Sequence, residues 1–230
     1  MSPLAREVTP EAMARMIDHT LLKPEARPED VERLCREAVE WGFGAVCVNP
    51  LYVRRAVRAL EGHPVKVAVV VGFPLGATTV LTRVVEAVEA VAAGAREVDM
   101  VAPAGLLLAG DEGGYAEAIR AVARAIGGDV ILKVILETGL LPSAEWKRRA
   151  ALVAVQEGAH FVKTSTGFGP GGATVDDVRL LAEAVAGRAG VKASGGIRTA
   201  EAALQMVEAG ATRIGTSSGV AILREMRGLR

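Results

Sequence analysis

Short runs of β-branched residues alternate with longer segments whose apolar residues recur at helical spacing, and this alternation constrains the fold more than any other feature. It is typical of βα units packed around a parallel sheet. After a helix at 10–16, the pattern predicts strands at 17–22, 45–49, 65–71, 97–102, 130–137, 160–164, 191–194 and 212–215. Eight such strands predict an α/β protein built as a closed (β/α)₈ TIM barrel, with the first helix as an N-terminal addition.

A repeated glycine signal supports the same fold. Four similar segments come directly before predicted strands, namely Trp41-Gly-Phe-Gly-Ala-Val, Ala93-Gly-Ala-Arg-Glu-Val, Glu157-Gly-Ala-His-Phe-Val and Ala209-Gly-Ala-Thr-Arg-Ile. Glycine just past a helix end adopts the left-handed conformation at little cost and turns the chain into the next strand. The stretch 105–114 is predicted as a loop that leads into a helix. No linker or shift of composition divides the 230 residues, so we expect one domain over 1–230.

Charge and composition exclude several function classes. The 27 basic and 27 acidic residues balance, which does not favour nucleic acid or an anionic membrane surface as a partner. Residues 1–10 lack the apolar core of a secretory signal, and no apolar run reaches the roughly 20 residues of a membrane span. The two cysteines are too few for a disulfide scaffold. We therefore expect a cytoplasmic protein that acts on a small soluble molecule.

Four of the six lysines lie within predicted strands, and three of them, Lys133, Lys163 and Lys192, are the most informative chemical feature of the chain. Lys133, Lys163 and Lys192 have apolar neighbours, and burying an unpaired charge there is costly. One interpretation is that each extends to solvent or pairs with a carboxylate such as Asp99 or Glu137. The other is that they serve chemistry, because active sites of these barrels lie at the C-terminal ends of the strands.

A lysine becomes a nucleophile only as the neutral amine. Two ammonium groups crowded in a pocket of low dielectric lower the pKa of one of them, and Lys163 and Lys192 are placed for this. We therefore predict that Lys163 attacks a small aldehyde and forms a Schiff base. Asp99 is its predicted acid partner, because a carboxylate in the same cavity can hold one lysine charged and carry protons through water.

Two consecutive loops are rich in anion donors. Ser194-Gly-Gly-Ile-Arg-Thr follows the seventh predicted strand and Gly215-Thr-Ser-Ser-Gly follows the eighth. Phosphate sites of such barrels are often built there, since glycines admit backbone N–H groups and hydroxyls add donors. Ordinary turn chemistry is the alternative, but two adjacent loops favour phosphate. Thr166, in the segment after Lys163, extends the same donor surface.

The remaining candidates are less specific. Asp18 and Thr20 close the first predicted strand, where they either bind substrate hydroxyls or form a structural network. Cys47 either faces the cavity or packs as a small buried hydrophobe. The histidines do not supply a metal cluster or a serine–histidine triad, and no dinucleotide fingerprint is present, so we expect neither a metal nor an organic cofactor.

The motifs together resemble those of the deoxyribose-phosphate aldolase family over nearly the whole chain. They are Asp18-His-Thr-Leu-Leu, Val46-Cys-Val-Asn-Pro, Val71-Gly-Phe-Pro-Leu-Gly, Glu97-Val-Asp-Met-Val, Leu132-Lys-Val-Ile-Leu-Glu-Thr, Val162-Lys-Thr-Ser-Thr-Gly-Phe and Val191-Lys-Ala-Ser-Gly-Gly-Ile-Arg. The resemblance implies a cofactor-independent class I aldolase, an aldehyde-lyase of deoxyribose catabolism. It would reversibly cleave 2-deoxy-D-ribose 5-phosphate into D-glyceraldehyde 3-phosphate and acetaldehyde.

The resemblance also assigns roles to residues. Lys163 would carry the Schiff base, Lys192 would activate it and Asp99 would relay protons. The family's phosphate site corresponds to Gly167, Gly195, Gly196, Arg198, Gly215, Ser217 and Ser218. Asp18, Thr20, Cys47, Lys133 and Thr166 complete the predicted substrate contacts. We also expect a homo-oligomer, either a dimer or a tetramer.

Two departures from the family pattern stand out. Residues 223–230 lack the C-terminal tyrosine that some members use, and Phe168 replaces a lysine found in others near the phosphate. Two rival functions are a Schiff-base lyase that acts on another sugar phosphate, and a barrel that only binds a phosphorylated metabolite. The second would have no reason to bury three lysines.

Overall fold

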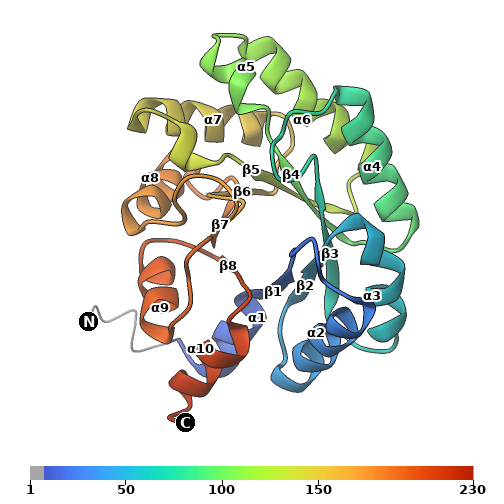
Figure 1. Cartoon of the computed structure of the whole chain (residues 1–230). Coiled ribbons are helices and arrows are strands. Elements are labelled where there is room, and N and C mark those ends of the chain that lie inside the picture. The colour runs from blue at the N-terminus through green and yellow to red at the C-terminus, as the bar shows by residue number, and fades with distance from the viewer. Residues whose placement is uncertain (1–7, 230) are drawn as a thin grey trace.

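Eight parallel strands form a closed barrel in the computed structural model, which describes residues 8–229. The strands pair in sequence order, and the last returns to the first (Figure 1). They are β1 (Ile17–Leu21), β2 (Ala45–Val48), β3 (Lys66–Val71), β4 (Glu97–Val101), β5 (Ile131–Ile135), β6 (Phe161–Lys163), β7 (Gly190–Ser194) and β8 (Arg213–Thr216). The predicted TIM barrel is thus confirmed. The prediction about a signal segment falls largely on residues 1–7, outside the described part.

Helices surround the barrel, and α1 (Pro10–Met16) precedes it as predicted (Figure 1). The others are α2 (Pro28–Trp41), η2 (Pro50–Tyr52), α3 (Val53–Ala59), α4 (Val80–Ala92), α5 (Ala104–Leu108), α6 (Glu112–Ile126), η3 (Thr138–Leu140), α7 (Ala144–Gln156), α8 (Val175–Val185), α9 (Ala200–Glu208) and α10 (Gly219–Met226). Several begin at a threonine or serine whose hydroxyl accepts a backbone N–H of the first turn. Across residues 8–229, no helix has the length and apolar character to cross a membrane.

The predicted boundaries differ from the observed ones by one or two residues in most places. The predicted strand at 130–137 ends at Ile135 because Glu137 takes a left-handed conformation, with φ of 52°, and leaves the sheet. The stretch predicted as a loop at 105–114 instead contains most of α5 and the start of α6. Leu107 explains this difference, since the short helix buries that side chain in the core.

The two faces of the barrel wall differ in chemistry. Side chains that point outward, such as Val69, Val98 and Leu132, are buried in the main apolar core. Inside the barrel, one side holds a small apolar cluster of Leu22, Cys47, Ala68 and Val70. The other side, which runs from β4 to β8 and on to Asp18 of β1, holds buried charged residues. Because apolar atoms and backbone surround these charges, their interactions are screened weakly.

The four repeated glycines have the predicted conformation. Gly42, Gly94, Gly158 and Gly210 each follow a helix with positive φ, between 71° and 110°. They differ in their surroundings. A Cβ at Gly42 would meet nothing within 4 Å, whereas one at Gly210 would lie 2.6 Å from the Cβ of Ala182. The conformation is therefore common to the repeat, but the packing is not.

We expect Gly210→Ala to lower the free energy of unfolding by about 2–4 kcal/mol, from backbone strain and overpacking together. Gly42→Ala is the matched control, because it imposes the left-handed strain alone and should cost only about 1–2 kcal/mol. Urea unfolding of both variants measures the difference. Equal losses at the two positions would contradict the packing argument.

Candidate active site

A cavity of about 290 Å³ opens where β1, β6, β7 and β8 end and their loops begin. Nine of the residues selected from the sequence lie in its lining: Thr20, Lys163, Thr166, Gly167, Gly195, Gly196, Arg198, Gly215 and Ser217. Parallel strands bring their carboxyl ends to one end of the barrel, which is why residues so far apart in sequence meet here. The cavity has the position and the donor groups that the sequence predicted.

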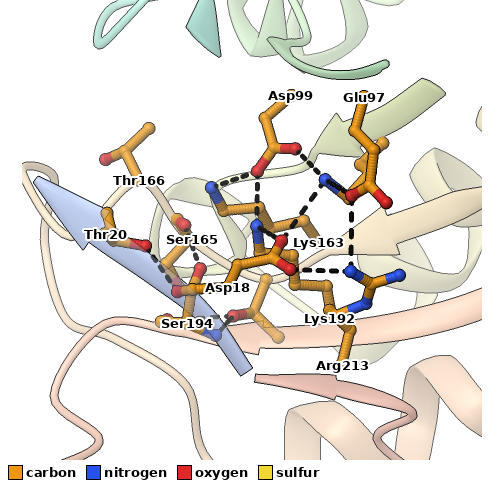
Figure 2. Close-up of polar contacts among 12 residues, drawn as sticks. Asp18, Thr20, Glu97, Asp99, Lys163, Ser165, Thr166, Lys192, Ser194 and Arg213 are labelled. Atoms are coloured by element: carbon orange, nitrogen blue, oxygen red, sulfur yellow. Dashed lines mark hydrogen bonds and ion pairs between the residues drawn. The ribbon is translucent and has the colours of Figure 1, made fainter. Parts of the chain in front are cut away.

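Lys163 forms part of the cavity lining, and beneath it lies a network of charges (Figure 2). Its Nζ lies 2.9 Å from Oδ2 of Asp99, and the Nζ of Lys192 lies 2.7 Å from the same oxygen. Lys163 and Lys192 are register partners on β6 and β7, while Asp99 reaches them from β4. The structure therefore brings together the three residues predicted to do the chemistry.

The two neighbouring lysines differ in their preference for a proton. Burial lowers the pKa of Lys163, and although the charge of Asp99 opposes this, the nearby Lys192 adds to the lowering. Burial acts on Lys192 in the same direction, but the carboxylates of Asp18 and Asp99 outweigh it and raise its pKa. Lys163 is thus the amine that gives up its proton more easily, and Lys192 stays an ammonium.

Asp99 and Asp18 are ionised in this network. Burial alone favours the neutral acid, but Lys133, Lys163 and Lys192 surround Asp99 and hold its pKa well below the usual range. Lys133, Lys192 and Arg213 lower the pKa of Asp18 in the same way, also against burial. Both carboxylates therefore act as acceptors between cations at neutral pH.

Asp18, Cys47 and Lys133 lie within the barrel but not in the cavity lining. Lys133 is fully buried, with its Nζ 2.6 Å from Oδ1 of Asp99 and 2.7 Å from Oε2 of Glu97. Asp18 accepts hydrogen bonds from Lys192 and Arg213. Cys47 packs in the apolar cluster, where burial raises the pKa of its thiol to about 11. The positions of these residues favour the alternatives considered from the sequence, a structural network and a buried hydrophobe.

The loops after β6, β7 and β8 supply much of the rest of the cavity lining. Gly167, Gly195 and Gly196 have φ between 82° and 91°, a conformation that suits glycine and keeps the backbone bare of side chains. Arg198 and Ser217 line the same region and are exposed. Ser218 is not in the lining, and its N–H donates to Oγ1 of Thr216 just before α10. Glycine backbone, a hydroxyl and a guanidinium thus converge on one part of the cavity.

Glu137 holds one of these loops, and it was considered from sequence only as a possible partner of lysine. Its buried carboxylate instead accepts hydrogen bonds from the N–H and Oγ1 of Thr166, at 3.2 and 2.5 Å. Oγ1 of Thr166 in turn accepts from the N–H groups of Phe168 and Gly169. Glu137 makes these contacts from a left-handed backbone conformation. A sequence does not reveal that conformation at a residue other than glycine.

Glu97 and Arg213 are charged residues of the barrel interior that the sequence reasoning missed. Nη1 of Arg213 lies 2.7 Å from Oδ1 of Asp18 and 3.4 Å from Oε2 of Glu97. A signal was present, because Glu97 precedes Asp99 by two residues and Arg213 precedes Gly215 by two. Alternate residues of a strand share a face, so both were placed to point inward.

Comparisons with known proteins agree with this geometry. A family model described as DeoC/LacD family aldolase matches residues 12–226. The deoxyribose-phosphate aldolase of Thermoanaerobacter sp. strain X514 is 54% identical over 220 residues, 95% of this chain and 98% of that protein. The deoxyribose-phosphate aldolase of Deinococcus radiodurans is 54% identical over 212 residues, 92% of this chain and 96% of that protein.

The solved structures include a similar barrel. A tetrameric deoxyribose phosphate aldolase from Aeropyrum pernix superposes with a TM-score of 0.89 at 36% identity, covering 95% of this chain and 92% of that one. The sequence matches and this superposition both extend over almost the whole barrel. The resemblance seen in the motifs is therefore confirmed, and the chain belongs to the DeoC/LacD family of aldolases.

Proposed function

We propose that the protein is a deoxyribose-phosphate aldolase that reversibly cleaves 2-deoxy-D-ribose 5-phosphate into D-glyceraldehyde 3-phosphate and acetaldehyde. The observation that carries the proposal is the position of Lys163. Its side chain is only 3% exposed, yet it lines a donor-rich cavity and lies beside Asp99 and Lys192. Its lowered pKa favours the neutral amine, which is the nucleophile that a Schiff base requires.

The reaction begins when the neutral amine of Lys163 attacks the aldehyde carbon of the open-chain sugar. A proton delivered to the hydroxyl of this adduct lets it leave as water, and the cation that remains is the protonated imine. A base then removes the proton of the C3 hydroxyl, the C2–C3 bond breaks, and its electron pair moves into the imine to form an enamine. Glyceraldehyde 3-phosphate leaves as the new aldehyde. Protonation of the enamine and hydrolysis of the imine release acetaldehyde and restore the amine.

Asp99 and Lys192 support the proton transfers of these steps. Asp99 accepts hydrogen bonds from both Lys163 and Lys192 through Oδ2, so it can pass a proton between the reacting nitrogen and water in the cavity. Lys192 remains charged, because the carboxylates of Asp18 and Asp99 raise its pKa more than burial lowers it. Its charge disfavours a second ammonium at Lys163 and thereby keeps the nucleophile available.

The substrate's phosphate is proposed to bind at the loops after β7 and β8. Gly195, Gly196 and Ser217 offer backbone and hydroxyl donors there, and Arg198 supplies a positive charge. Phe168, which is 52% exposed, replaces the lysine of some family members and packs edge-on against Phe73, with ring centroids 5.2 Å apart. Arg198 is therefore the cation that these loops offer to the phosphate, and Lys23 is a second exposed cation in the cavity lining.

The family membership also supports a proposal about the domain, location and assembly of the enzyme. We propose that residues 1–230 form one aldolase-type barrel domain that acts in the cytoplasm without a cofactor, with Cys35 and Cys47 as free thiols. We also propose a homo-oligomer, a dimer or a tetramer. Leu81, Val85 and Val88 support this, because they form an exposed apolar stripe on α4, and the Aeropyrum pernix relative is described as a tetramer.

Borohydride reduction in the presence of acetaldehyde should attach a two-carbon adduct to Lys163, because hydride traps the imine as a stable amine. Peptide mass mapping locates the adduct. Lys163→Ala should remove both the adduct and the retro-aldol activity while leaving the melting temperature close to that of the wild type. Lys147→Ala, on the outer helix α7, is the matched control and should keep both. Labelling of another lysine in preference to Lys163 would overturn the proposed nucleophile.

Arg198→Met should raise the KM for 2-deoxyribose 5-phosphate about tenfold, since an exposed charge-assisted contact to phosphate is lost. The kcat should change little, because Arg198 does not touch the reacting carbons. With unphosphorylated 2-deoxyribose, the variant and the wild type should have similar kcat/KM. Steady-state kinetics with both sugars, and with the exposed Arg179→Met as control, measure the effect. An equal loss with both sugars would argue against a phosphate contact.

A further inference from the structure

The charged network continues through the barrel to the end opposite the cavity. Lys163 contacts Asp99, Asp99 contacts Lys192, Lys192 contacts Asp18, and Asp18 contacts Arg213 on β8 (Figure 2). Arg213 also lines a separate hollow at the N-terminal ends of the strands, together with Lys66. A row of ion pairs thus connects the proposed nucleophile to residues that no substrate in the cavity can touch.

The cluster holds more cations than anions. Four cationic side chains, Lys133, Lys163, Lys192 and Arg213, face three carboxylates, Asp18, Glu97 and Asp99, and none of the seven side chains is more than 13% exposed. Net charge in such a dry interior is costly. The charges balance when one of the amines gives up its proton.

The contacts indicate which amine this is. Lys133 is within ion-pair distance of three carboxylates, and Lys192 and Arg213 are each within ion-pair distance of two. Lys163 contacts only Asp99, and it shares that oxygen with Lys192. Because Lys163 has the least anionic stabilisation of the four, it is the group that loses its proton at the lowest cost.

We propose that Arg213 and Glu97 are positioning residues that set the protonation of Lys163 from the far end of the barrel, through the total charge of the buried cluster. Arg213 favours the neutral amine, and Glu97 opposes it. The inference rests on the proposed function of Lys163, and neither residue lines the cavity that holds it. Arg213 provides the fourth cation and occupies Asp18 and Glu97. Without it, the remaining charges would balance with Lys163 protonated, and the nucleophile would be lost at neutral pH.

Arg213 and Glu97 are the residues whose substitution can test this proposal. The titratable groups that act on Lys163 from the other strands are Cys47 (β2), Asp99 (β4) and Lys192 (β7), and Asp18 (β1) and Lys133 (β5) join them through ion pairs with Lys192 and Asp99. Most belong to the catalytic network itself, so their removal would not separate charge from chemistry. At the far end Lys66, Arg15 and His63 line the hollow with Arg213. Lys66 is half exposed and 3.7 Å from Glu97, so water screens its charge.

The test is a double-mutant cycle read by the pH dependence of kcat/KM for the retro-aldol reaction. Arg213→Met removes a cation and should move the acid limb to higher pH by roughly one unit, with about tenfold less activity on that limb and recovery at higher pH. Glu97→Gln removes an anion and should move the limb to lower pH by a similar amount. The double variant keeps the original excess of one cation, so its profile should return towards that of the wild type.

A second readout does not depend on turnover. The yield of the borohydride-trapped acetaldehyde adduct on Lys163, measured against pH, should shift in the same directions in the same variants. Arg179→Met on the protein surface is the control, and melting temperatures monitor folding. If Arg213→Met does not fold, the pH dependence of Glu97→Gln and of the double variant tests the proposal.

The outcomes separate the two proposals. Wild-type protein that neither turns over the sugar phosphate nor forms the adduct would refute the proposed function. An active wild type whose pH profile is unchanged in Glu97→Gln, or shifts in the same direction in Glu97→Gln and Arg213→Met, would refute only the inference drawn from the charge of the cluster.

Discussion

One carboxylate oxygen shared by two lysines is the interaction on which the rest of the site depends. Oδ2 of Asp99 lies 2.9 Å from Nζ of Lys163 and 2.7 Å from Nζ of Lys192. The arrangement brings two ammonium groups close enough to compete, and it leaves the one with fewer anionic partners as the weaker base. The difference between the two lysines therefore arises from their neighbours, since both are buried side chains of the same type.

Burying this network of charges costs free energy, and the geometry of the barrel allows the close ion pairs that offset the cost. Charges lose their water when they enter the interior, and only close pairing offsets that loss. Here each of the seven charged side chains of the barrel cluster has at least one opposite charge within 4 Å, and Lys133 has three. Eight strands pointing alternate residues inward make such density possible. A barrel optimised for stability alone would fill the same space with branched apolar residues.

The cavity combines rigid and adaptable parts. The charged residues stand on strands, whose hydrogen bonds hold them in place, whereas the proposed phosphate site consists of loops rich in glycine. Glu137 connects the two parts. It follows β5, and through Thr166 it orders the loop that carries Gly167 and Phe168. The geometry of the proposed phosphate site thus depends on a buried carboxylate that lies outside the charged cluster.

Sequence alone determined the barrel, the helix ends at the repeated glycines, and the meeting of Lys163, Lys192 and Asp99. Hydrophobic period and glycine placement are local properties, and barrel geometry brings strand ends together once the strands are counted. The tertiary structure alone decided which carboxylate pairs with which lysine, that Arg213 and Glu97 complete the cluster, and that Glu137 binds a loop rather than a lysine. The pairing of the charges depends on side-chain distances across the barrel, and the role of Glu137 depends on its left-handed backbone. A sequence does not contain these distances, and the pKa of each lysine is set by every charge around it.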